Sequence, residues 1–249
     1  MAEVLDWFGF KGKRCTDYGV RVEKLPPITL AEERVDFEEV PGRSGDLTIT
    51  EESTDKRPVF KSMEFPIECF VENIDKLDGM AAWLLGSGPL VLPNRPGGTY
   101  TGHVVNRMEL ERVIKGHEIR RFTVDFHVQP YFQLDDSADI ESTAASFVIT
   151  NPGSAESAPR IAVYGSGDVS IAMAGQNVLL TGLVDGIIMD TVLQDALSLD
   201  GAQLLNNNMA GDFLTIPPGE STLSWHAFDG NDNPGTVTRI VVTPRWRCR

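Results

Sequence analysis

The segment Arg34–Glu51 constrains what this chain can fold into more than any other stretch of its sequence. Two runs in which apolar and polar residues alternate flank the turn sequence Pro41–Gly42–Arg43–Ser44–Gly45. The alternating apolar residues are Val35 and Phe37, which point one way on the first run, and Leu47 and Ile49 on the second. Alternation with a period of two, bounded by Pro, Gly and Ser residues, predicts a long β-hairpin.

Acidic side chains occupy many of the remaining positions, namely Asp36, Glu38, Glu39, Asp46, Glu51 and Glu52. A hairpin that is half apolar and half charged needs a surface to pack on, because two strands alone are marginally stable in water. Either the same subunit or a neighbouring subunit supplies that surface. We expect a neighbour, and the predicted subunit-interface residues are Phe37, Val40, Pro41, Gly42, Arg43, Ser44, Gly45, Leu47 and Ile49.

The overall composition is that of a globular protein. A chain of 249 residues is long enough for one large or two ordinary domains. No run approaches the roughly 18–20 apolar residues of a membrane helix, and the N-terminal segment does not resemble a secretory signal. We therefore expect synthesis in a cytoplasm, followed by use there or release by lysis.

Charge and cysteine content exclude several function classes. The formal net charge of −14 argues against nonspecific binding of nucleic acid to the exterior. It is compatible with a conduit that DNA crosses without adhering. The three cysteines, Cys15, Cys69 and Cys248, form no metal or disulfide pattern, and Cys69 is expected in the core.

A change in composition near residue 140 predicts two domains. Residues 1–140 hold 17 Lys+Arg and 25 Asp+Glu, which is 42 of 140 or about 30%, whereas residues 141–249 hold 5 and 11, which is 16 of 109 or about 15%. The segment Leu134–Ser146 is small, polar and acidic, as is typical of a linker. The predicted domains are residues 1–138 and 139–249.

The first domain is expected to be mostly strands with one helix. The alternating runs are Tyr18–Leu25, Met63–Cys69 and Phe122–Val128, and Pro130 is expected to end the last one. Pro66 predicts an edge strand or a bulge in the second run. The predicted helix has Asn73 as N-cap, Gly86 at its C-terminal end and an apolar stripe of Ile74, Leu77, Ala81 and Leu84.

The second domain is expected to be all β. Its short apolar runs are Phe147–Thr150, Ile161–Tyr164, Val169–Met173, Val178–Leu180, Ile187–Asp190, Phe213–Ile216, Leu223–Trp225 and Val237–Thr243. The turn sequences between them include Gly165–Ser166–Gly167 and Pro217–Pro218–Gly219. Short strands at this spacing predict a β-sandwich or jelly roll.

The sequence shows no catalytic, cofactor or metal motif. The histidines, His103, His117, His127 and His226, lack metal-ligand spacing, and no nucleophile elbow or phosphate-binding loop occurs. Most acids of the second domain, Asp168, Asp185, Asp190, Asp195, Asp200 and Asp212, stand beside glycines or at strand ends, where Asp favours turns. Asp229–Asn233 starts like a calcium loop, but Pro234 and Ile240 replace its essential Gly and Glu, so we expect a polar hairpin tip.

Aromatic residues of the second domain offer the one small-molecule hypothesis. Tyr164, Trp225 and Phe228 could stack on sugar rings if they line a groove, although Trp225 alternates with Leu223 and is expected in the core. Trp246 lies between two arginines and is expected to act as an inter-domain or inter-subunit clasp.

Several short motifs follow one another in an order that covers nearly the whole chain. In the first half they are Phe8–Gly9–Phe10, Asp17–Tyr18–Gly19, Glu33–Arg34, Pro41–Gly42–Arg43–Ser44–Gly45, Trp83–Leu84 followed by Gly88, and the Phe122–Pro130 strand. In the second half they are Asn151–Pro152–Gly153, Ser157–Ala158–Pro159, Gly211–Asp212–Phe213, Pro217–Pro218–Gly219 and Pro244–Arg245–Trp246–Arg247. In this order they resemble the distal tail proteins, or Dit family, of long-tailed phages.

The resemblance implies a mainly β fold: an N-terminal β-sandwich with one helix and a protruding hairpin, and a C-terminal galectin-like β-sandwich. It implies a hexameric ring in the virion tail, assembled in the host cytoplasm, that joins the tail tube protein to tail-tip or baseplate proteins. DNA would cross its lumen without specific binding, and neither a cofactor nor an enzymatic activity is expected. Between Ser142 and Thr238 only Arg160 and His226 are of the basic types that galectins use, which favours a docking platform over sugar binding.

Two alternative functions are also compatible with the sequence. The protein could be a host-surface carbohydrate-binding module, in which case Tyr164, Trp225 or Phe228 should line an open groove. It could also be an enzyme, such as a polysaccharide- or peptidoglycan-degrading tail component, which needs two carboxylates roughly 5–10 Å apart in a cleft.

Overall fold

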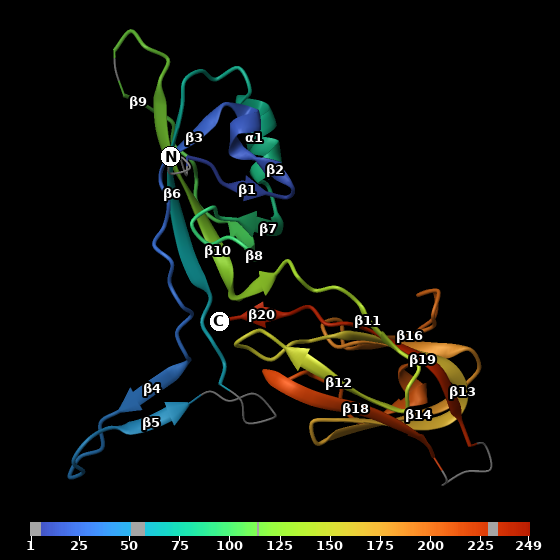
Figure 1. Ribbon diagram of the computed structural model, residues 1–249. Coiled ribbons are helices and arrows are strands. Elements are labelled where there is room, and N and C mark those ends of the chain that lie inside the picture. Colours follow the sequence, from blue (N-terminus) through green and yellow to red (C-terminus); the bar gives the residue numbers. More distant parts are fainter. Residues whose placement is uncertain (1–5, 51–57, 114, 229–233) are drawn as a thin grey trace. The chain divides into compact units, whose positions relative to one another are not determined.

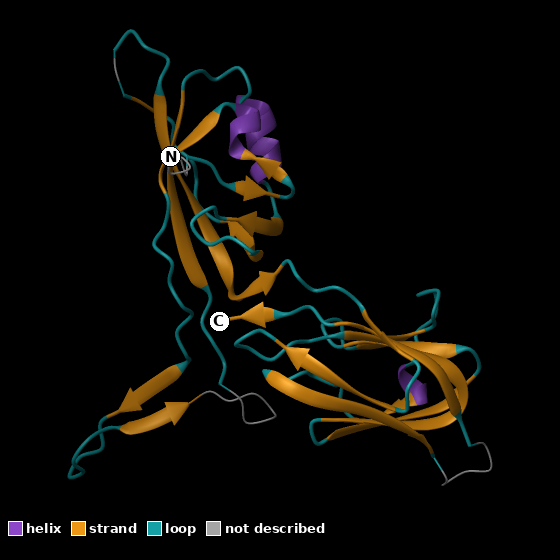
Figure 2. Cartoon of the chain, in the orientation of Figure 1, coloured by secondary structure: helices purple, strands orange, loops and turns teal. Residues whose placement is uncertain are grey.

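The computed structural model describes residues 6–50, 58–113, 115–228 and 234–249. Strands dominate these residues, which confirms the predicted mainly β class (Figure 2). The described part of the chain contains one α-helix, α1 (Leu77–Leu84), and it has no helix with the length and apolar content to cross a membrane. The chain divides into two compact units: residues 1–132 with Arg249, and residues 133–248 (Figure 1).

One antiparallel sheet forms most of the first unit. Its strands are β1 (Gly9–Phe10), β2 (Lys13–Arg14), β3 (Val20–Lys24), β6 (Met63–Val71), β7 (Ser87–Val91), β8 (Gly98–Val104), β9 (Glu111–Arg112) and β10 (Arg120–Leu134). The strand order is β2-β1-β7-β8-β10-β6-β3, with β9 beside β10, and a short 3₁₀ turn, η1 (Cys15–Tyr18), precedes β3. Alternate residues of β6 and β10 are buried, as the sequence pattern predicted.

Aromatic rings fill the core beneath α1. Trp83 of the helix stacks on Phe8 with ring centroids 5.5 Å apart and on Tyr18 at 4.8 Å. Its indole N–H donates a hydrogen bond of 2.7 Å to the Phe10 carbonyl. Such rings bury large apolar areas, and the hydrogen bond satisfies the one polar atom of Trp83. The helix is therefore fixed to the sheet by this side chain.

The helix is shorter than predicted. The Asn73 side chain accepts from the Asp75 N–H at 3.4 Å in a preceding turn, so the expected N-cap was wrong and the helix begins after Lys76. Ile74 and Ala81 of the predicted stripe are exposed, whereas Leu84 is buried as predicted, and Met80 and Trp83 complete the buried face. The packing of Trp83 sets the helix rotation, which the stripe alone did not indicate. Gly86 does have the left-handed φ of +79° expected after a helix.

Of the predictions made from two prolines in this sheet, one is confirmed and the other is wrong. Pro66 pairs with Asp125 of β10, but the pairing of β6 with β3 ends at Glu68, so β6 is an edge at the level of Pro66. A bulge in β3 between Val22 and Lys24 lies beside this point. The expectation that Pro130 ends its strand was wrong, since β10 continues to Leu134. Pairing with β6 ends at Val128, so the missing N–H of Pro130 costs no bond to β6.

The predicted hairpin is present as a separate two-stranded sheet, β4 (Val35–Glu38) and β5 (Leu47–Thr50). At its base Glu33 forms a bridge with Phe60, the Arg34 N–H donates to the Val59 carbonyl at 2.8 Å, and the Lys61 N–H donates to the Glu32 carbonyl at 2.7 Å. These bonds connect the hairpin to the chain that enters β6.

The second unit contains two groups of strands joined by one long strand. Its strands are β11 (Ile140–Ser142), β12 (Ser146–Asn151), β13 (Arg160–Met173), β14 (Gln176–Leu183), β15 (Gly186–Asp190), β16 (Asp195–Leu197), β17 (Met209–Ala210), β18 (Gly219–Ala227), β19 (Thr236–Thr243) and β20 (Arg247–Cys248). A 3₁₀ turn, η2 (Asn206–Asn208), precedes β17. Residues 160–164 of β13 pair with β15 and β19, whereas residues 169–173 pair with β14 and β18.

The turn predicted at Gly165–Ser166–Gly167 was wrong, because β13 runs through it. The register shifts on both sides of these residues, as in β-bulges, and the strand changes neighbours there. A side chain on Gly165 would lie 2.1 Å from the Thr236 carbonyl oxygen, so this position requires glycine for close backbone approach. The two expected strands, Ile161–Tyr164 and Val169–Met173, are thus halves of one bent strand.

Two other expectations for the second unit were wrong. Phe213–Ile216 is not a strand: Ile216 forms an isolated bridge with Ser157, and the Thr215 N–H donates to the Gln176 side chain at 2.9 Å. Trp246 is not a clasp but a core residue of this unit, 5% exposed, because the last segment of the chain packs its ring among the buried aliphatic side chains.

Candidate interaction surface

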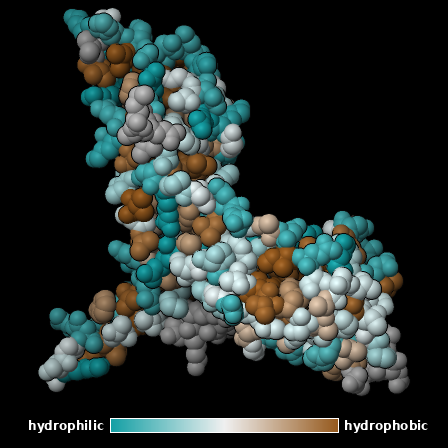
Figure 3. Space-filling view, in the orientation of Figure 1, coloured by the Kyte–Doolittle hydropathy of each residue, from teal (hydrophilic) through white to brown (hydrophobic). Residues whose placement is uncertain are grey.

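The hairpin β4–β5 exposes large apolar side chains. Phe37 is 68% exposed and Ile49 is 45% exposed, and Val40 and Leu47 are exposed as well. The tip, residues 41–46, turns with a hydrogen bond of 3.1 Å from the Arg43 N–H to the Val40 carbonyl. Figure 3 shows hydrophobic and hydrophilic atoms side by side on this element. Exposed apolar side chains grouped on one element are typical of interaction surfaces.

The strand register gives the hairpin two chemically different faces. Directly opposed residues of paired strands lie on the same face. The pairs Val35–Thr50 and Phe37–Thr48 make one face without any charge, which we call the uncharged face. The pairs Asp36–Ile49 and Glu38–Leu47 make the opposite face, which carries two acids beside two aliphatic side chains. Sequence alternation predicted both apolar pairs but did not show that they lie on opposite faces, because register depends on how the tip closes.

The carbohydrate candidates lie on or directly after two different strands, β13 and β18. Tyr164 is on the half of β13 that pairs with β19, and the Arg239 guanidinium lies 4.0 Å from its ring centroid. Trp225 pairs with Ile171 on the other half and packs against the core. Phe228 follows β18, with its N–H donating to the Asp168 carbonyl at 2.9 Å. A pocket of about 410 Å³ in this unit is lined by other residues.

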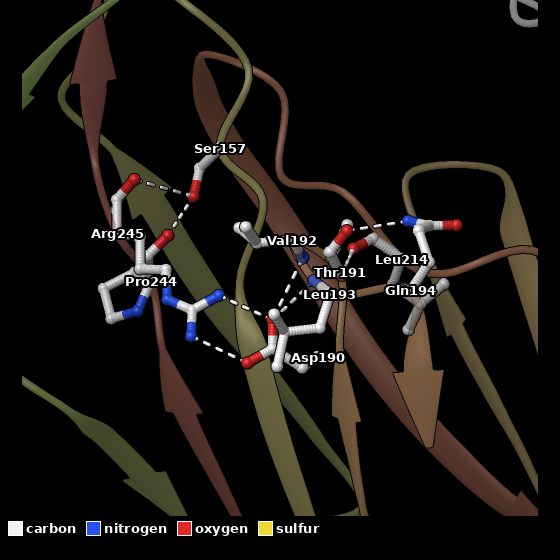
Figure 4. A network of polar contacts seen from close by, with 9 residues as sticks. All are labelled: Ser157, Asp190, Thr191, Val192, Leu193, Gln194, Leu214, Pro244 and Arg245. Carbon is white, nitrogen blue, oxygen red and sulfur yellow. Dashed lines mark hydrogen bonds and ion pairs between the residues drawn. The ribbon is translucent and has the colours of Figure 1, made fainter. Parts of the chain in front are cut away.

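The buried acids of the second unit have structural partners. Asp190 forms two hydrogen bonds with Arg245, at 2.7 and 2.8 Å, and also accepts from the Val192 and Leu193 N–H groups (Figure 4). The hydrogen bonds from Arg245 are the main reason that the pKa of Asp190 lies below its usual value. Asp168 accepts from the Gly182 N–H at 2.7 Å. These contacts fix loops and strand ends.

Cysteine and metal chemistry find no support in the described residues. Burial raises the pKa of the Cys15 thiol to about 11, and burial raises the pKa of Cys69 as well, so neither thiol is activated as a nucleophile. Within residues 6–50, 58–113, 115–228 and 234–249, no three His, Cys, Asp or Glu side chains are grouped as metal ligands. The calcium-loop candidate Asp229–Asn233 lies outside the described residues.

Sequence reasoning missed the contact between Asp190 and Arg245. Asp190 was interpreted as a strand-end residue and Arg245 as part of a clasp around Trp246. The two side chains are 55 positions apart, and local pattern carries no signal for such a pair. The only hint is the crowding of arginines into the last eleven residues of a unit that is otherwise poor in cations.

No protein-family model matches the sequence, and no curated protein matches it. A solved structure with a similar fold is the Dit (gp 19.1) protein of SPP1, described as a paradigm of the hub adsorption apparatus in phages that infect Gram-positive hosts. The TM-score is 0.73 at 15% sequence identity, and the match covers 96% of this chain and 98% of that chain. The chain therefore has the fold of the SPP1 Dit protein along nearly its whole length, as the resemblance in its sequence predicted.

Proposed function

We propose that this protein is a structural hub of a phage tail. In this proposal six copies form a ring that connects the tail tube to tail-tip or baseplate proteins and leaves a channel for DNA. The observation that carries the proposal is the similarity in fold to the SPP1 Dit hub protein over 96% of the chain. Because one fold can host several functions, the surfaces of this chain must also fit the role.

The hairpin supplies the first supporting argument. It presents exposed apolar side chains on both of its faces. Burial of the Phe37 side chain against a neighbouring copy would stabilise that contact by roughly 1.5–3 kcal/mol. A contact between different patches on successive copies is heterologous, and it closes into a ring when the rotation between copies fits. The hairpin and the surface of the next copy that receives it would form such a contact.

The charge supplies the second argument. A net charge of −14 for each copy would make an assembled ring strongly acidic. Phosphate groups of DNA do not adhere to an acidic surface, which favours passage over binding. We propose the virion tail as the location of the protein and the host cytoplasm as the place of assembly, with a tube protein and a tip protein as neighbours.

The carbohydrate-binding alternative has less support from the placement of its residues. A sugar platform needs an open aromatic face, whereas the guanidinium of Arg239 covers one face of Tyr164, and Trp225 packs against the core. A glycan array probed with the folded protein tests this alternative directly. Binding that is lost on Tyr164→Ala would favour it.

Light scattering after size-exclusion chromatography, followed by negative-stain imaging, tests the ring. We expect a closed oligomer with six-fold symmetry and a central hole, for the protein alone or after mixing with a tube or tip protein. A strictly monomeric protein under both conditions would contradict the proposal. The imaging is decisive because symmetry and a hole distinguish a ring from an open aggregate.

A further inference from the structure

A pocket of about 410 Å³ opens between two loops of the second unit. One loop joins β14 to β15 and contributes Val184, and the other joins β16 to β17 and contributes Leu199 and Leu205. Val184 is 80% exposed, which leaves an apolar rim open to solvent. Four of the eleven lining residues are apolar and the others are polar, acidic or glycine, so the pocket offers both apolar contacts and polar groups to a ligand.

Hydrogen bonds hold both loops in shape. The Ser198 N–H donates to the Gln203 carbonyl at 2.9 Å, which closes the second loop. The Asn208 side chain donates to the Thr181 carbonyl at 2.9 Å and so ties the second loop to the end of β14. The Gly182 N–H donates to the Asp168 carboxylate, which is itself buried. The pocket is thus preformed, and a ligand need not order it.

The charged groups of the lining are all acidic. They are Asp185 and Asp200, and the lining contains no Lys, Arg or His. The Asp200 carboxylate accepts from the Ser198 hydroxyl and from the Ala202 N–H at 3.0 Å, and these bonds fix its position at the rim. The Asp185 backbone carbonyl accepts from the Gly165 N–H at 3.1 Å, which anchors that residue beside β13.

The unit has few cations of its own to neutralise these acids. No lysine follows Lys115, and only five arginines follow residue 140. Arg245 is committed to Asp190, and Arg239 lies over Tyr164 and pairs with Glu141 at 3.4 Å. Charge complementarity therefore favours a cation supplied by another molecule.

We propose that this pocket binds a lysine or arginine side chain that stands beside an apolar residue on a segment of a partner protein. The methylene stem would lie against Val184 and Leu199, and the cationic head would reach Asp185 and Asp200, as long basic side chains do at apolar surfaces. The inference rests on the proposed function only in naming the partner as another tail protein. The chemistry of the pocket does not depend on ring formation.

Fluorescence anisotropy of the full chain tests the proposal with a labelled pentapeptide, Gly-Leu-Lys-Leu-Gly. The comparison probe replaces its lysine with norleucine, which keeps the stem and removes the charge. We expect the lysine probe to bind at least tenfold more tightly than the norleucine probe. The double variant Asp185→Asn, Asp200→Asn should abolish that tenfold preference. The matched control Asp212→Asn, Glu220→Gln removes two exposed acids elsewhere in the unit and should leave the preference unchanged.

Equal binding of both probes would overturn the proposal, and so would a lysine preference that survives in the double variant. A third such result would be a protein that does not bind the peptide but binds the sugar lactose through Asp185 and Asp200. Thermal unfolding of each variant checks that the unit remains folded. Because the assay does not require a ring, a protein that binds the lysine probe but stays monomeric both alone and after mixing with a tube or tip protein would contradict the hub proposal alone. Rings that ignore the probe would contradict the pocket proposal alone.

Discussion

At the scale of single residues, the contact between Asp190 and Arg245 shows how the second unit fixes the end of its chain. The Arg245 backbone has a left-handed φ of 54°, which is unfavourable for a residue with a side chain. This conformation accompanies two hydrogen bonds to Asp190, and the adjacent Pro244 carbonyl accepts from the Ser157 hydroxyl (Figure 4). Trp246 follows directly and enters the core. The polar contact and the buried ring together secure the last segment.

Replacement of Asp190 should therefore destabilise the second unit. The Asp190 side chain is 5% exposed and that of Arg245 is 35% exposed, so the pair is partly shielded from water. We expect Asp190→Asn to lower the free energy of unfolding by about 2–3 kcal/mol, less than for a fully buried pair because solvent reaches the guanidinium. Denaturant unfolding measures the change, and Asp212→Asn, at an exposed acid, is the control. Equal losses in both variants would contradict the assigned role.

The same pair gives a pH dependence with a definite sign. Arg245 lowers the pKa of Asp190 in the folded state, so the stabilisation is fully present above the unfolded-state pKa of about 3.9. It is lost as the pH falls through the lower folded-state pKa. The stability difference between the wild type and Asp190→Asn should stay constant from neutral pH to about pH 5 and shrink below about pH 4. A difference that grew on acidification would exclude this explanation.

At the scale of elements, β13 shows what short apolar runs can and cannot predict. Two such runs predicted both halves of the strand, and nearly all of their residues are buried. The glycines between the halves have the composition of a turn, and their pairing with β19 and β14 shows that the strand continues. The helix α1 is a second example: the glycine after its C-terminal end was predicted correctly, but the residue at which it starts was not. Local chemistry predicts conformations; partners in space decide where elements end.

Gly165→Ala should be strongly destabilising. The added methyl would lie 2.1 Å from the Thr236 carbonyl oxygen, so β13 and β19 would have to separate. We expect a loss of more than about 2 kcal/mol in the free energy of unfolding, as for other overpacked sites. Gly79→Ala in α1 is the matched control, because its methyl would meet Tyr18 at an ordinary 3.5 Å and should stabilise the helix by about 0.5–1 kcal/mol. Similar effects of the two substitutions in calorimetry would argue against the bulge interpretation.

At the scale of the whole molecule, the order of weak motifs was more informative than any single one. The fold similarity covers 96% of the chain at only 15% identity, so the two proteins share an arrangement of strands although most of their side chains differ. The interface residues of the hairpin remain a prediction of the sequence. The structure adds that Phe37 and Ile49 are exposed and face opposite ways. A hairpin with two usable faces could contact more than one neighbouring surface in the proposed ring.

Substitutions can distinguish the contributions of the two hairpin faces to the contact between copies. Phe37→Asp places a charge on the uncharged face, opposite Thr48, and should prevent its burial against a neighbour. If each contact loses the roughly 1.5–3 kcal/mol of a buried Phe, its association constant falls by about ten- to 150-fold, enough to replace rings by monomers at micromolar concentration.

Val148→Asp is the control for that experiment, since Val148 is 60% exposed on β12 in the second unit and its substitution adds the same charge. Native mass spectrometry of both variants should show loss of the oligomer only for Phe37→Asp, with the melting temperature of the monomer unchanged because the hairpin packs outside the core. Rings that persist in Phe37→Asp would exclude the uncharged face from the contact. The contact would then be assigned to the opposite face, where Leu47 and Ile49 lie beside acids. A partner that binds this face would need to present basic groups.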